Sequence, residues 1–160
     1  MSDCVLAIDP GPSESAYVLF NGSIPYEGHV MPNEELRRYV RAVGLPADVA
    51  IEGIACYGMP VGKETFDTCI WIGRFIEAHG GTHSIIYRPE VKQHLCRSAR
   101  AKDANVRQAL IDRFGPGKDK AIGRKASPGP LYGIKSHCWS ALAVAVTWWD
   151  KSLTPNPESE

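Results

Sequence analysis

Short apolar segments, separated by turns rich in glycine and proline, constrain the fold of this chain more than any other feature. Val5–Ile8 is an apolar run that the sequence Asp9-Pro10-Gly11-Pro12 brings to an end. Residues 16–20 and 24–30 have the same strand character, and Asn21-Gly22 between them is typical of a tight hairpin. The first 30 residues are therefore predicted to form a three-stranded meander.

Helices and strands alternate after the meander. Strands are predicted over 49–54 and 83–87, and helices over 32–43, 64–78, 89–95, 103–114 and 136–150. Helix-ending residues Gly44 and Pro46 follow the first of these helices, and Ser136 is placed to cap the last. Five glycines and three prolines between positions 115 and 134 predict a mobile loop. This element order is that of the ribonuclease H-like α/β fold, a mixed five-stranded sheet flanked by helices.

The length and composition predict one soluble domain. The chain has 160 residues, of which 44% are hydrophobic and 22% charged. We expect a folded domain over residues 1–151 and a disordered tail over 152–160. No run approaches the roughly 20 apolar residues of a membrane span, and no secretory leader is visible, so a cytoplasmic protein is expected. Five widely spaced cysteines without a Cys-x-x-Cys pair are expected to be reduced and mostly buried.

The net charge of zero conceals a basic segment. Residues 1–87 contain five Lys or Arg against eleven Asp or Glu, whereas residues 88–125 contain eleven against four. Clustered cations of this kind suit a polyanion such as a nucleic acid. A solvated basic surface that balances the acidic half explains the same pattern equally well on charge alone.

Two acidic residues stand where strand ends are predicted. Asp9 follows the first strand, and Glu52 lies within the apolar run Val49–Ile54. If these strands are parallel neighbours, the two carboxylates converge at one edge of the sheet, where a metal cation would offset the cost of burying them. Each acid taken alone is explained as well by a turn or a salt bridge. His137 and Ser140 share one side of the last helix and would face the two acids.

Five motifs together resemble the RuvC family of Holliday junction resolvases, and most of all its divergent phage-type members. They occur in the family's order and cover residues 4–149. The motifs are Ile8-Asp9-Pro10-Gly11, Ile51-Glu52, Glu90-Val91-Lys92, Ala101-Lys102-Asp103 and the segment from His137 to Ala145.

The resemblance implies an Mg²⁺-dependent endonuclease that nicks four-way DNA junctions symmetrically as a homodimer. Two ions per site are expected, with Mn²⁺ as a substitute for Mg²⁺. Asp9 and Glu52 match the first two catalytic carboxylates of the family, and His137 matches the third position, where members carry Asp or His. Lys92 and Lys102 match two lysines that act near the scissile phosphate.

The fourth metal-ligand position of the family is normally Asp, and here it is Ser140. A neutral hydroxyl is a poorer ligand for a hard cation than a carboxylate, so the second ion would be held more weakly. Asp103 is an alternative fourth acid, although a role as the N-cap of the following helix is favoured.

Other residues are expected to contact DNA or a second subunit. Tyr57, in the loop after Glu52, could stack on an unpaired base, although ordinary packing explains it equally well. On the helix over 64–78, Trp71 and Phe75 are assigned to a dimer surface, with a covering loop as the alternative. The opposite arc of that helix is assigned to the core: Phe66, Cys69, Ile70, Ile72, Gly73 and Ile76. The basic segment supplies the candidate phosphate contacts Arg97, Arg100, Arg107, Lys118, Lys120, Arg124 and Lys125.

Three alternative functions fit parts of the sequence. A junction-binding protein would keep the fold and the DNA but lose cleavage through Ser140. An actin-like ATPase or sugar kinase would use Asp9-Pro10-Gly11 as a phosphate loop, although such enzymes usually need two large lobes. A nuclease that acts on structured RNA would use the same cationic surface, because contacts to the backbone do not identify the sugar.

Overall fold

A five-stranded sheet lies at the centre of the molecule, and its strand order is β3-β2-β1-β4-β5. The computed structural model describes residues 3–43 and 48–154. The strands β1, β2 and β3 pair antiparallel, while β4 and β5 run parallel to β1. This arrangement confirms the predicted mixed sheet. The strands are β1 (Val5–Asp9), β2 (Glu14–Phe20), β3 (Pro25–Pro32), β4 (Asp48–Gly53) and β5 (His83–Tyr87).

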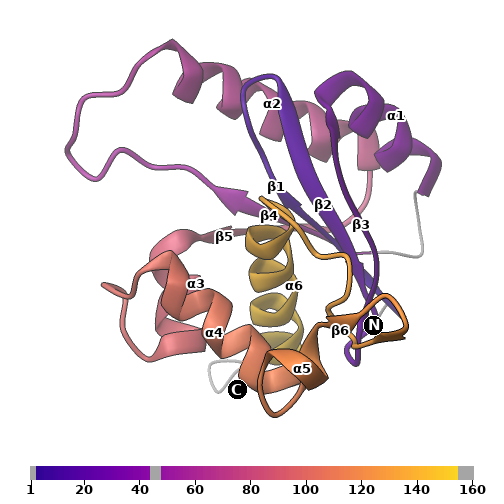
Figure 1. Ribbon diagram of the computed structural model, residues 1–160. Coiled ribbons are helices and arrows are strands. Elements are labelled where there is room, and N and C mark those ends of the chain that lie inside the picture. The colour runs from indigo at the N-terminus through magenta and orange to yellow at the C-terminus, as the bar shows by residue number, and fades with distance from the viewer. Residues whose placement is uncertain (1–2, 44–47, 155–160) are drawn as a thin grey trace.

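Helices cover both faces of this sheet (Figure 1). Helices α1 and α2 pack together on one face, and α6 lies against β1, β2 and β4 on the other, with α3 and α4 beside it. A two-residue ladder joins β6 (Gly123–Arg124) to β7 (Ser127–Pro128). The helices are α1 (Asn33–Val43), α2 (Lys63–His79), α3 (Arg88–Cys96), α4 (Asp103–Phe114), α5 (Lys118–Ala121) and α6 (Cys138–Leu153).

Successive side chains of each strand point to opposite faces of the sheet, where they pack into two separate cores. Leu6, Ile8 and Ile51 are fully buried on the side of α1 and α2. Ala7 and Ala50 point to the opposite side, where they meet α6. Because every second residue of a strand faces the same way, this pattern fixes the side to which the residues at the strand ends point. Helix α6 is buried along most of its length, as its apolar composition predicted.

The segment 115–134 is not the mobile loop that its glycines and prolines predicted. It contains α5 and the β6–β7 ladder, and it is anchored by Ala121 and Leu131, both fully buried. Gly129 lies so close to the backbone of Ala121 that a Cβ atom would be 2.5 Å from the Ala121 carbonyl oxygen. The glycines therefore permit close packing of the backbone here.

The two ends of α6 differ from the sequence prediction. Ser136 was expected to cap the helix, but the N-cap residue is His137, and Ser136 adopts a left-handed conformation with φ of 49°. At the other end the helix continues to Leu153, so residues 152 and 153 are helical rather than part of a disordered tail. Residues 155–160, like Gly44 and Pro46, lie outside the described residues.

The buried face of α2 differs in part from the predicted one: Ile72 and Ile76 pack against the core as predicted, but so do Trp71 and Phe75. Phe75 is fully buried and Trp71 packs partly against the same core, while Phe66 and Ile70 are 61% and 60% exposed. The helix carries apolar residues on two sides, and α1 covers the side that contains Trp71 and Phe75. The guanidinium of Arg74 lies 4.0 Å from the centre of the Trp71 ring.

The cysteines are free, as predicted, but they are less buried than expected. Cys138 is buried, Cys4 and Cys96 are partly buried, and Cys56 and Cys69 are exposed. In the part of the chain that the structure describes, no helix is both long and apolar enough to cross a membrane.

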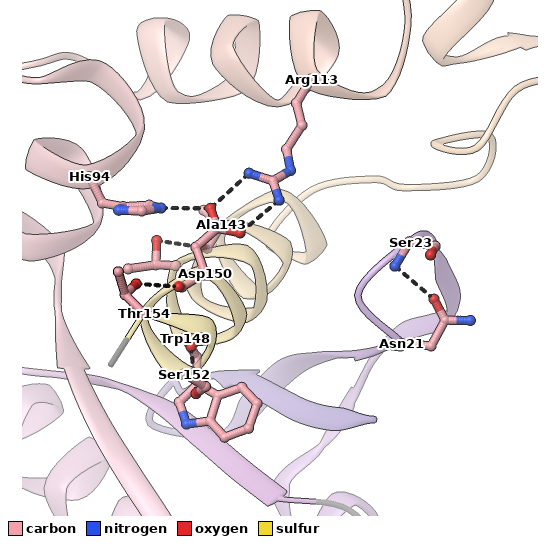
Figure 2. A network of polar contacts seen from close by, with 10 residues as sticks. Asn21, Ser23, His94, Arg113, Ala143, Trp148, Asp150, Ser152 and Thr154 are labelled. Carbon is pink, nitrogen blue, oxygen red and sulfur yellow. Dashed lines mark hydrogen bonds and ion pairs between the residues drawn. The ribbon is translucent and has the colours of Figure 1, made fainter. Parts of the chain in front are cut away.

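A charged cluster near the end of α6 joins three helices (Figure 2). Arg113 of α4 donates two hydrogen bonds of 2.7 Å to the carboxylate of Asp150, and His94 Nε2 of α3 lies 2.7 Å from Asp150 Oδ2. Burial raises the pKa of Asp150, but the hydrogen bonds from Arg113 and His94 outweigh it and hold that pKa below the ordinary value. Asp150 therefore stays ionised and fixes α3 and α4 to α6.

The variant Asp150→Ala is expected to lower the free energy of unfolding by about 2 kcal/mol near neutral pH, because Arg113 and His94 lose a shared charged acceptor. The folded-state pKa of Asp150 lies below its ordinary 3.8. Its contribution is therefore present above pH 3.8 and disappears as the pH falls through the folded-state value.

Urea unfolding of both proteins at several pH values measures this difference. Asp112→Asn is the control, since Asp112 is exposed on α4 and accepts one hydrogen bond from Gln108 on the same helix. A loss for Asp150→Ala no larger than that of the control would contradict the assignment.

Candidate active site

Two carboxylates meet at the carboxyl end of the parallel strands. In the register between β1 and β4, Ile8 lies opposite Ile51, and Asp9 and Glu52 are the next residue of each strand. Both side chains point to the side of α6 by the alternation described above. Asp9 is 16% exposed and Glu52 14% exposed. The fold thus brings together two acids that are 43 positions apart in the sequence.

A buried polar network holds the turn that follows Asp9. Ser15 donates a 2.6 Å hydrogen bond to Asn33 Oδ1, and its hydroxyl accepts one of 3.0 Å from the backbone N–H of Gly11. Asn33 in turn donates to the Gly11 carbonyl oxygen at 2.9 Å. A Cβ on Gly11 would lie 2.4 Å from the Glu14 carbonyl oxygen, so glycine is required there. The position of Asp9 is therefore set by β1 on one side and by this turn on the other.

His137, at the start of α6, contacts Asp9. Its Nδ1 lies 3.1 Å from Asp9 Oδ2, and its side chain is 72% exposed. The imidazole is thus both in contact with the buried carboxylate and accessible to a ligand from solvent. Left-handed Ser136 immediately precedes it and sets the direction in which the chain enters the helix.

Burial of two like charges changes their protonation. Burial raises the pKa of Asp9, and contacts with His137, Glu52 and Arg88 oppose that rise without cancelling it. Burial, followed by the negative charge of Asp9, raises the pKa of Glu52 to about 8, although Arg88 opposes the rise. Near neutral pH the pair therefore holds a proton, and a cation placed between the two groups would displace it.

Arg88 is a third charged group at this edge, and the sequence analysis did not single it out as a site residue. It follows Tyr87, the last residue of β5, which pairs in parallel with β4. Its Nε lies 3.8 Å from Glu52 Oε1, and its Nη2 donates a 2.6 Å hydrogen bond to Asp103. Its position just after β5, two residues beyond the Ile86 that pairs with Glu52, could have identified it.

Asp103 has a different role from the helix N-cap that was favoured. The N-cap of α4 is Lys102, and Asp103 is the first helical residue. The Asp103 carboxylate pairs with Arg88, and Lys92 Nζ lies 3.8 Å from its Oδ1. The hydrogen bond from Arg88 lowers the pKa of Asp103. Lys102 has an exposed side chain and precedes Asp103 directly, so Lys92 and Lys102 flank the Arg88–Asp103 pair.

Two hollows of opposite charge lie on either side of His137. The acidic hollow, about 440 Å³, is lined by the carboxylates Asp9, Glu14 and Glu64. The basic hollow, about 640 Å³, contains Ser140 in its lining together with Asp103 and three cationic side chains. Those cationic residues are Arg88, Arg107 and Lys135. Ser140 therefore belongs to the basic side of the site.

The predicted phosphate contacts divide into two groups along α4. Arg107 lines the basic hollow and its guanidinium lies 4.7 Å from the centre of the Trp139 ring, while Arg97 and Arg100 are exposed between α3 and α4. The other four follow the far end of α4, whose 12 residues span about 18 Å. They are Lys118 and Lys120 of α5, Arg124 of β6, and Lys125.

Tyr57 lies in the loop between β4 and α2. Its side chain is 65% exposed and its backbone has a φ of 50° in the left-handed region. This conformation is uncommon for a residue with a large side chain. The exposed ring is therefore presented to solvent on the segment that leads directly away from Glu52.

The donor chemistry at this edge suits a hard divalent cation. Two carboxylates are the oxygen ligands that Mg²⁺ and Mn²⁺ select, and a cation that binds between Asp9 and Glu52 would relieve their repulsion. Asp9 contacts His137, whereas Glu52 is paired with Arg88. Within residues 3–43 and 48–154, no three His, Cys, Asp or Glu side chains already form a metal-binding cluster.

The variant Glu52→Gln is expected to stabilise the metal-free protein by about 2 kcal/mol at pH 8, because an amide removes one of two repelling buried charges. The folded-state pKa of Glu52 is above its ordinary 4.5, so the stability of the parent falls as pH rises from 4.5 to about 8. The advantage of the variant should therefore grow over this range and then level off.

Thermal and urea unfolding in the presence of a chelator test this expectation. Glu77→Gln, on the exposed side of α2, controls for the general effect of removing a carboxylate. Destabilisation by Glu52→Gln at pH 8 would show that the ion pair with Arg88 outweighs the repulsion from Asp9.

Comparison with known proteins places this geometry in a known fold. No protein-family model and no curated protein matches the chain. Among solved structures, the Thermus thermophilus RuvC structure is 21% identical with a TM-score of 0.63, and the match covers 93% of this chain and 95% of that one. T. thermophilus RuvC in complex with Holliday junction substrate is 19% identical with a TM-score of 0.66, covering 90% and 91% respectively. The chain is thus a distant structural neighbour of RuvC and has a RuvC-like fold.

Proposed function

We propose that this protein is a divalent-metal-dependent endonuclease that cleaves four-way DNA junctions. The observation that supports the proposal is the pair of buried carboxylates Asp9 and Glu52 at the carboxyl end of β1 and β4, with His137 in contact with Asp9. The fold is shared with T. thermophilus RuvC, which has been solved with a Holliday junction substrate. Because a fold alone does not determine an activity, the charged site within the fold is the stronger argument.

Each residue of the site has a distinct task in the proposed reaction. Asp9 and Glu52 would hold the divalent cation, with His137 completing its ligands. When bound, such a cation polarises a phosphodiester and lowers the pKa of water. Lys92 and Lys102, on the side of Asp103, would attract the phosphate and offset the charge that develops on it.

The basic side chains give the DNA a path to the site. Arg107 lines the basic hollow beside Ser140, so a phosphate in that hollow would lie next to the candidate catalytic groups. Arg97 and Arg100 would contact the backbone on the same side. Lys118, Lys120, Arg124 and Lys125, beyond the far end of α4, would contact a more distant arm. Tyr57 would stack on an unpaired base at the crossover.

Ser140 gives a specific reason to consider binding without cleavage. Its hydroxyl is neutral, and the hollow that it lines contains more cationic than acidic groups. If cleavage requires a second ion at that position, the protein would bind junctions and leave them intact. The same cleavage assay separates the two functions.

The purified protein is expected to nick a synthetic four-way junction in the presence of Mg²⁺ or Mn²⁺. Asp9→Asn should reduce cleavage by more than about 100-fold, since even residues that only support a metal ligand contribute about 10- to 100-fold. Denaturing gels resolve the cleavage products. Flaps and RNA hairpins of equal length are tested as alternative substrates in parallel.

Binding assays under the same conditions control for loss of substrate affinity. Asp9→Asn should retain junction binding in a chelating buffer, because the basic side chains are unchanged. Tight junction binding by the parent with no metal-dependent nicks would favour the binding protein, and preferential cleavage of RNA hairpins would favour an RNA substrate.

Five exposed apolar side chains close in sequence, called the apolar band below, support a homodimer. They are Tyr57, Met59 and Val61 from the loop after β4, with Phe66 and Ile70 from α2. Large apolar side chains left exposed in a group are candidates for an interaction surface. A four-way junction has two equivalent strands to cut, and a two-fold dimer would present one site to each. The band thus replaces Trp71 and Phe75 as the proposed interface.

The double variant Phe66→Glu/Ile70→Glu is expected to be monomeric and to lose paired nicking of opposed strands. Association would bury two unpaired carboxylates in an apolar interface, and the free-energy cost of that burial exceeds what a typical interface contact contributes to binding. Analytical ultracentrifugation measures the mass of the protein in solution. With a plasmid that extrudes a cruciform, a single nick gives open circles, whereas paired nicks on opposed strands give linear DNA. Tyr132→Glu, at an exposed site on the loop before α6, is the control. A dimeric double variant would exclude this band as the interface.

A further inference from the structure

We propose that Arg88 takes the place of a second metal ion, so that the site binds one divalent cation rather than two. The inference rests on the proposed nuclease function and goes beyond the two ions that the family resemblance implies. It concerns the side chains around the basic hollow, where Ser140 stands instead of an acid.

The first argument is the placement of the guanidinium. Arg88 begins α3 directly after β5, and its Nε lies 3.8 Å from Glu52 Oε1. Its Nη2 donates a 2.6 Å hydrogen bond to Asp103, which holds the side chain in this position. The site therefore has a fixed positive charge beside Glu52.

The second argument is the balance of charge. Asp9, Glu52 and Asp103 contribute three carboxylates, and Arg88 and Lys92 contribute two positive charges that offset them. When all three carboxylates are ionised, a single divalent cation more than neutralises the remaining negative charge. A second divalent cation would leave three uncompensated positive charges in a partly buried site, where such an excess is costly.

The third argument is the composition of the basic hollow. A second ion near Ser140 would lie in a hollow lined by Arg88, Arg107 and Lys135 and would find a neutral hydroxyl at position 140. The carboxylate in this lining, Asp103, is already paired with Arg88. Hard cations select anionic oxygen ligands, and neighbouring positive charges repel them. The hollow is better suited to a phosphate than to a metal ion.

The fourth argument is an incomplete set of hydrogen bonds on Arg88. Its Nη1 is buried and has no hydrogen-bond partner among the described residues. If Arg88 served only to pair with Glu52 and Asp103, its buried N–H groups should all have acceptors, because a buried donor without an acceptor destabilises the fold. Because Arg88 lines the basic hollow, a phosphodiester oxygen bound there is the acceptor proposed for this donor.

Counting bound Mn²⁺ tests the proposal without relying on cleavage. Electron paramagnetic resonance of the full-length protein should show one Mn²⁺ per chain and no magnetic coupling between ions, whereas paired ions in two-metal sites lie about 4 Å apart and couple. Arg88→Lys should still bind one ion. Arg88→Met/Ser140→Asp, which removes the cation and restores an acid, should bind two. Arg38→Met, on exposed α1, is the control and should match the parent.

The dependence of cleavage on Mg²⁺ provides a second measurement on the unmodified protein. Below saturation, a tenfold increase in Mg²⁺ should raise the rate by about tenfold for one ion and by about 100-fold for two. Two coupled ions on the parent protein, or a 100-fold response, would overturn the role of Arg88 while leaving the nuclease function in place. Absence of both bound Mn²⁺ and cleavage would overturn the proposed function, and this inference with it.

Discussion

The parallel pairing of β1 with β4 is the constraint on which the candidate site depends. The register that places Ile8 beside Ile51 also places Asp9 beside Glu52, because each acid is the next residue in its strand. A shift of one residue would turn Leu6, Ile8 and Ile51 away from their core, so the register is fixed by burial. The close approach of two carboxylates is therefore a consequence of the same packing that forms the sheet.

The surroundings of the acids offset the cost of burying them, and the repulsion that Asp9 exerts on Glu52, only in part. His137 contacts Asp9 from α6, and Arg88 approaches Glu52 from the end of β5, yet the pKa of each acid remains raised. The structure thus retains a local destabilisation at the end of an otherwise well-packed scaffold, a pattern common to sites that bind a cation or a substrate. The rigidity comes from elsewhere, including the Asp150 cluster that fixes α3 and α4 to α6.

Local patterns predicted the elements of this fold well, and long-range contacts account for what they missed. The strands, the main helices and the positions of Asp9, Glu52 and His137 follow from periodicity and turn residues. The Arg88–Asp103 ion pair joins residues 15 positions apart across two helices, and the capping rule that favoured Asp103 as an N-cap cannot detect it. The two apolar sides of α2 and the anchors Ala121 and Leu131 also depend on partners that the local sequence does not specify.

Distant similarity to RuvC shows which features of the molecule can change independently. At about one-fifth sequence identity the fold is shared over more than nine-tenths of both chains, so strand order and core packing tolerate extensive substitution. The charges at the sheet edge are not required by that packing, since Arg88, Asp103 and Ser140 lie around hollows rather than within either core. A change in the number or kind of cations at this edge can therefore arise without disturbing the scaffold. For this reason the chemistry of the chain must be argued from the few side chains at the ends of β1, β4 and β5.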